Sequence, residues 1–196
     1  MLSGNRKKFS AWEKSIGKNM SFLSANSWTA LSIIFALLAA YMITQNMLVF
    51  GAAFFAITAL CDAIDGAVAR HTKTSSSKGA YLDTIVDRYV EFFIITGLFF
   101  ASLPYLWPGA KFWLFAYLFG SVMTTYAKAA AKEKGLIQQE MRFGLMERAE
   151  RLSFLFLGLL LGAISGIYLI YMIALLAILS NITALQRISK AFSGAK

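Results

Sequence analysis

Six long stretches of mostly apolar residues, separated by shorter polar segments, follow one another along this chain. They cover residues 27–45, 48–69, 80–103, 110–131, 147–164 and 167–186. Each is close to the ~20 residues with which an α-helix crosses the ~30 Å hydrocarbon core of a bilayer. The pattern therefore predicts an all-α integral membrane protein with six transmembrane helices.

The first 20 residues follow a different pattern. Phe9, Trp12 and Ile16 recur at helical spacing among lysines, which is typical of an amphipathic helix that lies in the membrane interface. We therefore expect residues 1–20 to form a juxtamembrane helix on the cytoplasmic side. No repeat or linker interrupts residues 21–196, which we expect to form one six-span domain.

The distribution of charge predicts how the chain is inserted. Of its residues, 58% are hydrophobic and 15% charged, against roughly 25% charged in soluble domains. Lys and Arg give a net charge of +9 and are concentrated before the first stretch, in the second-to-third and fourth-to-fifth loops and in the tail. By the positive-inside rule these segments are cytoplasmic. We therefore expect a multi-pass plasma-membrane protein with both termini in the cytoplasm, whose basic charge contacts anionic lipid headgroups and not nucleic acid.

Four aspartates lie in or at the edge of the second and third stretches: Asp62, Asp65, Asp83 and Asp87. An ionised Asp inside a membrane helix costs about 2.5 kcal/mol or more unless it is neutralised. Residues three or four apart share a helix face, and the short loop between the stretches predicts antiparallel neighbouring helices. Both pairs would then lie about 12 Å inside the cytoplasmic end. Such a density of hard oxygen ligands favours Mg²⁺, Mn²⁺ or Ca²⁺ over zinc.

Small residues and an arginine surround these carboxylates. Gly66 and Gly79 would let a ligand approach the backbone closely, and Arg70 offers a fork suited to phosphate oxygens. Ser76 is one of three serines that add hydroxyls in the intervening loop. Together they predict a pyrophosphate-binding cleft. In the alternative, the aspartates only pair with Arg70 and Arg88, but four acids outnumber these partners.

Residues 62–87 match a family motif at every fixed position. The motif, Asp-x2-Asp-Gly-x2-Ala-Arg-x8-Gly-x3-Asp-x3-Asp, is that of the CDP-alcohol phosphotransferases, which the chain resembles over essentially its whole length. The resemblance implies a membrane enzyme that forms a homodimer and transfers a phosphatidyl-type group from a CDP-linked lipid to an acceptor hydroxyl. CMP is the other product.

The resemblance also implies roles for individual residues. Asp62, Asp65 and Asp83 would hold two Mg²⁺ (or Mn²⁺) ions, and Asp87 would join this metal set and act as general base. Six residues would contact the nucleotide or donor: Asn26, Thr29, Gly66, Ala69, Arg70 and Gly79. We expect Ser76 to join them. Asn26 and Thr29 resemble the Asn and Thr of a Pro-Asn-x-x-Thr segment in the family. In this chain Ala25 stands where that segment has its proline.

Cations near the fifth stretch bear on the identity of the acceptor. Arg148 and Arg151 are three residues apart on the first turns of a helix whose N-terminus would face the cytoplasm. The helix dipole and two guanidinium groups there favour a phosphate. The surrounding run, Glu-Arg-Ala-Glu-Arg, resembles the branch of the family that uses inositol 1-phosphate, the phosphatidylinositol-phosphate and archaetidylinositol-phosphate synthases. We therefore expect the acceptor phosphate to contact Lys128, Arg142, Arg148 and Arg151.

Three other interpretations stay open from the sequence. Glycerol 3-phosphate is also anionic and would use the same cations. The cations could instead reflect topology alone, with Glu147 pairing with Arg151 at i,i+4 spacing. A divalent-cation transporter would explain the aspartates, but it would leave Arg70, Gly66 and Gly79 without a role.

Two features concern helix packing. Glu91 follows Arg88 by three residues, a spacing at which the two side chains are expected to pair. Gly158, Gly162 and Gly166 form a ridge of small residues that allows another helix to approach closely. That helix could belong to the same chain or to a second copy in a dimer.

Overall fold

The computed structural model describes residues 15–137 and 144–194, and these residues form α-helices and no strand. The long helices are α2 (Ala25–Thr44), α3 (Leu48–His71), α4 (Ser77–Phe100), α5 (Ala110–Glu133), α6 (Arg148–Ile164) and α7 (Gly166–Gly194). The all-α prediction is confirmed, and α7 runs well beyond the expected end at residue 186. Within the described part of the chain, α2, α3 and α7 are the helices long and apolar enough to cross a membrane. The count of six spans stays a prediction.

The predicted amphipathic helix falls largely on residues 1–14, which lie outside the described residues. Residues 15–19 are helical. Gly17 packs directly on α3, because a Cβ at this position would come within 2.6 Å of the Ala67 carbonyl oxygen. The chain that leads into α2 is therefore held against the same helix that carries Asp62 and Asp65.

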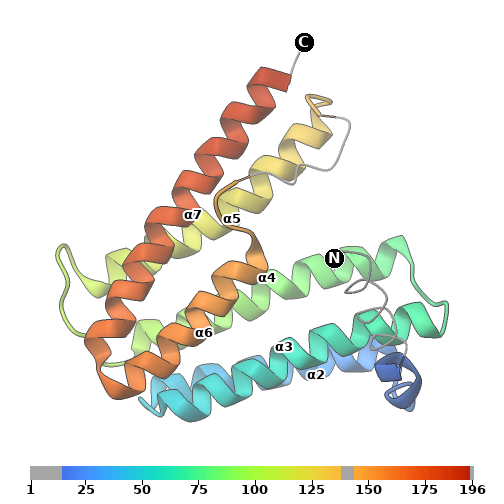
Figure 1. Cartoon of the computed structure of the whole chain (residues 1–196), viewed down its shortest axis with the longest axis horizontal. Helices are drawn as coiled ribbons and strands as arrows, with labels where there is room; N and C mark the ends of the chain where they lie inside the picture. The colour runs from blue at the N-terminus through green and yellow to red at the C-terminus, as the bar shows by residue number, and fades with distance from the viewer. Residues whose placement is uncertain (1–14, 138–143, 195–196) are drawn as a thin grey trace, which may run out of the picture.

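The helices fall into two groups that diverge (Figure 1). In the first group α3 and α4 each pack on α2. In the second group α5 packs on α7, and α6 contacts both α7 and α3 and so joins the groups. The groups meet near the α4–α5 loop and separate toward the opposite end (Figure 1). The expectation that α3 and α4 are close neighbours is thus only partly met, since α2 supplies the main contact for both.

The buried apolar core belongs to the end where the two groups meet. Most of its residues come from the C-terminal halves of α2 and α4 and the N-terminal halves of α3, α5 and α7, among them Ile43, Phe55, Ile94, Leu114 and Leu169. In an antiparallel bundle these halves lie at one end. The aspartates and most cations come from the other halves, so the polar chemistry lies where the groups diverge.

The glycine ridge is used within the chain. A Cβ on Gly158 would lie 2.9 Å from Met172 Cγ, and one on Gly162 would lie 2.8 Å from Leu169 Cβ. Both contacts are made with α7, so these small residues allow α6 and α7 to approach closely. Of the two alternatives, intramolecular packing is confirmed.

Candidate active site

Three of the four aspartates converge between α3 and α4. One oxygen from each of Asp62, Asp83 and Asp87 lies within 4.8 Å of the others. Three carboxylates this close repel one another when ionised unless a cation neutralises them. Their hard oxygen atoms, offered from two helices, fit a divalent ion such as Mg²⁺ or Mn²⁺. We call Asp62, Asp83 and Asp87 the carboxylate trio.

Asp65 stands outside the trio and has its own partner. It is 7% exposed, and the Thr29 hydroxyl on α2 donates a hydrogen bond of 2.6 Å to its Oδ2. Thr29, which we expected near the nucleotide, is therefore in place to orient Asp65. Asn26 lies three residues earlier on the same helix and is exposed.

The other residues expected at the donor gather at the facing ends of α3 and α4. The guanidinium of Arg70 lies over Gly66, because a Cβ there would come within 3.2 Å of Arg70 Nη1. Ala69 directly precedes Arg70 on α3. Across the loop, Ser76 caps α4, and its hydroxyl oxygen accepts from the Gly79 backbone N–H at 3.1 Å. The structure thus brings the predicted donor residues to the same end as the carboxylates.

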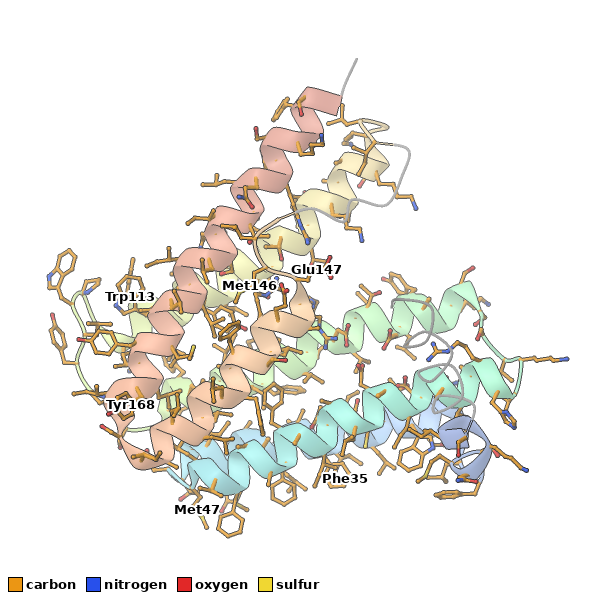
Figure 2. The ribbon with its side chains drawn as sticks, viewed as in Figure 1. Phe35, Met47, Trp113, Met146, Glu147 and Tyr168 are labelled. Carbon is orange, nitrogen blue, oxygen red and sulfur yellow. The ribbon has the colours of Figure 1, made fainter. Side chains whose placement is uncertain are left out.

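A cavity of about 490 Å³ adjoins the trio on the side of α5 and α6. Its lining includes Asp87 itself and is otherwise rich in cations and hydroxyls: Thr84, Arg88, Thr124, Thr125, Lys128, Glu147, Arg148, Arg151 and Arg187. Five cations face two acids, so the cavity has a net charge suited to a multiply charged anion. We call it the basic cavity. Figure 2 shows Glu147 at the start of α6, in the angle between α4 and the α5–α7 pair.

Three of the four predicted acceptor contacts line this cavity. Lys128 comes from α5, and Arg148 and Arg151 come from the first turn of α6. Arg148 also reaches the trio, since its Nη2 lies 2.5 Å from Asp87 Oδ1. The fourth predicted contact, Arg142, lies outside the described residues.

Sequence reasoning missed two cations of this cavity. The sequence indicates Arg187 only as one of the basic residues of the tail. In the structure it is 8% exposed, and its Nη1 donates a hydrogen bond of 2.8 Å to the Thr124 carbonyl oxygen on α5. The sequence offered one signal for its position: Arg187 directly follows the stretch 167–186, so the helix could continue through it. Arg88 was expected to pair with Glu91, which is confirmed at 2.9 Å, but its place in the cavity wall was not foreseen.

Comparison with known proteins places this arrangement in a family. Residues 22–185 match the CDP-alcohol phosphatidyltransferase family. The chain belongs to this family. It is accordingly a transferase of substituted phosphate groups, as the motif at residues 62–87 predicted.

Individual relatives agree with this assignment. The chain is 33% identical to an archaetidylinositol phosphate synthase of Pyrococcus horikoshii over 195 residues, which cover 97% of this chain and 96% of that protein. Its fold matches the crystal structure of Mycobacterium tuberculosis phosphatidylinositol phosphate synthase with CDP-DAG bound, with a TM-score of 0.80 at 25% identity over 92% of this chain and 94% of that one. The same synthase in complex with manganese and citrate matches with a TM-score of 0.79 at 25% identity, over 92% and 89% of the two chains.

Proposed function

We propose that this protein transfers a phosphatidyl-type group from a CDP-linked lipid to inositol 1-phosphate and releases CMP. The observation that carries the proposal is the basic cavity beside the carboxylate trio, joined to it by the contact between Arg148 and Asp87. The trio suits the pyrophosphate of the donor, and the cavity suits a second anionic substrate. An enzyme that joins the two needs both sites side by side.

The carboxylates would hold the metal that the donor requires. Asp62, Asp83 and Asp87, with Asp65 beside them, offer enough oxygen ligands for two Mg²⁺ or Mn²⁺ ions. When bound, such ions neutralise the pyrophosphate and stabilise CMP as the leaving group. The mycobacterial relative was crystallised both with CDP-DAG and with manganese, which supports a CDP-lipid donor and a divalent metal here.

Asp87 lies where a general base is needed. It belongs to the trio and also lines the basic cavity, so it can reach both the donor phosphate and an acceptor hydroxyl. In the proposed reaction Asp87 takes the proton of that hydroxyl while the oxygen forms a bond to the phosphorus that carries the lipid. The bond from this phosphorus to the CMP oxygen breaks, and CMP leaves with the electron pair.

The charge of the cavity favours a phosphorylated acceptor. Lys128, Arg148 and Arg187 approach it from three different helices, α5, α6 and α7, and a phosphate group offers these cations a negative charge that free inositol or serine does not. The Pyrococcus relative is named for an inositol phosphate product, which supports inositol 1-phosphate over glycerol 3-phosphate. Glycerol 3-phosphate carries the same phosphate and is the second candidate.

The remaining features of the proposal concern the membrane. Polar chemistry at one end of the bundle and apolar packing at the other suit six spans with both termini and the active site on the cytoplasmic side of the plasma membrane. A homodimer is proposed on the family resemblance. The lipid part of the donor is either diacylglycerol or archaeol.

An acceptor panel tests the proposal. Purified protein in lipid nanodiscs is given Mg²⁺ and either CDP-diacylglycerol or CDP-archaeol, with inositol 1-phosphate, glycerol 3-phosphate, free inositol or serine, and CMP release is followed. We expect the highest kcat/KM with inositol 1-phosphate. A preference for an uncharged acceptor would contradict the proposal. A cation transporter would instead show uptake into proteoliposomes without CMP release.

A further inference from the structure

Arg88 and Arg151 line the basic cavity and are held by a buried polar network. This network contains Glu91, a carboxylate outside the carboxylate trio. Glu91 lies on α4, one turn after Asp87, and is 2% exposed. Its Oε2 accepts a hydrogen bond of 2.9 Å from Arg88 Nη1, and its Oε1 accepts one of 2.9 Å from the Tyr117 hydroxyl on α5. The same Oε1 lies 3.8 Å from Arg151 Nε on α6.

A buried hydroxyl joins the same two arginines from the other side. Ser121 on α5 is 0% exposed. Its oxygen accepts from Arg88 Nη1 at 3.3 Å and from Arg151 Nη2 at 3.2 Å. Two guanidinium groups from different helices are therefore held beside each other by one carboxylate and one hydroxyl.

The arrangement holds two positively charged groups side by side, which is electrostatically unfavourable. Arg88 and Arg151 carry like charges and both line the basic cavity, and Arg151 is only 1% exposed. Glu91 is the carboxylate that the described contacts place against both guanidinium groups, and a buried guanidinium without a counter-ion is strongly unfavourable. Glu91 balances one of the two charges, and the remaining charge faces the cavity.

We infer that Glu91, fixed by Tyr117, is a positioning residue that holds Arg88 and Arg151 as the part of the cavity that binds the acceptor's phosphate. The inference rests on the proposed function, because it assigns the cavity to a phosphorylated acceptor. Glu91 itself does not touch the acceptor. It sets the place of two guanidinium groups that would otherwise separate.

Glu91→Gln distinguishes positioning from a simple effect of charge. The amide keeps the shape and can still accept from Tyr117, but it removes the negative charge that holds the arginines. If the arginines lose their place, the KM for inositol 1-phosphate rises about ten-fold or more while the KM for the CDP-lipid stays unchanged. If Glu91 only reduces the positive charge of the cavity, its neutralisation tightens acceptor binding instead, and the inference is wrong.

Tyr117→Phe is the second variant and guards against misfolding of the first. It removes one hydrogen bond to Glu91 and leaves every charge in place. Because Glu91 is then held less firmly, we expect the acceptor KM to rise by about three-fold or more. Glu133→Gln and Tyr126→Phe are matched controls on α5, where Glu133 is paired with Lys134 at the surface and Tyr126 is 62% exposed. Both controls leave the kinetics unchanged.

Thermal unfolding and phosphate binding complete the test. An equal loss for donor and acceptor, together with a lower Tm, would make the network structural and overturn the inference. Binding of inorganic phosphate to wild type and variants, measured by calorimetry, reports on the arginines whatever alcohol the enzyme uses. If wild type turns over an uncharged acceptor but phosphate binding still weakens in Glu91→Gln, the proposed function fails, while the role of Glu91 in positioning the two arginines for a phosphate stands. Unchanged phosphate binding in both variants would overturn the inference alone.

Discussion

Arg148 and Asp87 form an ion pair that links the carboxylate trio to the basic cavity. Nη2 of Arg148 lies 2.5 Å from Oδ1 of Asp87, and the two side chains are 27% and 16% exposed. Both groups are thus open to a ligand. The pair joins the first turn of α6 to the middle of α4, so the residue proposed to bind the acceptor's phosphate directly touches the proposed base.

Replacing Arg148 by Ala should weaken binding of the acceptor and not of the donor. A hydrogen bond to a charged group is worth about 1.5–3 kcal/mol, so the KM for inositol 1-phosphate should rise about ten-fold or more. Steady-state kinetics with each substrate varied in turn measures the effect. Lys134→Ala, which removes the same charge from an exposed site, should change neither KM. Parallel losses for donor and acceptor would show that Arg148 is structural.

Asp87→Asn should abolish turnover while the donor still binds. The amide cannot accept the acceptor's proton, and loss of a general base typically lowers kcat by about 10²- to 10⁴-fold. Three aspartates remain for the metal, so binding of the CDP-lipid in the presence of Mg²⁺ should persist. Single-turnover CMP release and a separate binding measurement would resolve the two effects. Near-normal turnover in this variant would remove Asp87 from the role of base.

Asp62→Ala and Asp83→Ala should fail at an earlier step. Each removes one ligand from the carboxylate trio, and the remaining oxygens hold a divalent ion less well. We expect binding of the CDP-lipid to require far more Mg²⁺ or Mn²⁺, or to be lost. Titration of metal against donor binding is the measurement. The same metal dependence in both variants and wild type would contradict a metal site at the trio.

Thr29→Val should resemble a mild version of the Asp62 and Asp83 variants. It keeps the shape of the side chain but removes the hydrogen bond to buried Asp65. A hydrogen bond to a charged group is worth about 1.5–3 kcal/mol, so half-saturation with Mg²⁺ should need about ten-fold more ion. Thr96→Val is the control, because among the described residues the Thr96 hydroxyl bonds only the Phe92 carbonyl of its own helix. If the two variants behave alike, Thr29 does not orient Asp65.

The chemistry of the trio was predictable from the sequence because it depends on local spacing. Hydropathy determined where the helices run, and the three- and four-residue intervals placed each aspartate pair on one helix face. The short loop between α3 and α4 then fixed which ends face each other. These relationships follow from the helical repeat and the length of the connection, so Asp62, Asp83 and Asp87 could be brought together without a structure. The same spacing grouped Asp65 with them, and the structure places it outside the trio.

The sequence predicted Lys128, Arg148 and Arg151 in the basic cavity, but its complete wall was decided only by the tertiary structure. Arg187 is 100 residues after Asp87 in the chain, yet both line it. Arg151, which the sequence predicts as an acceptor contact at a helix N-terminus, is also buried against Glu91 and Ser121. The hydrogen bond from Thr29 to Asp65 likewise needs α2 to pack beside α3. Helical periodicity states which face a side chain is on, but which helix that face meets depends on how the whole bundle packs, and no local pattern contains that information.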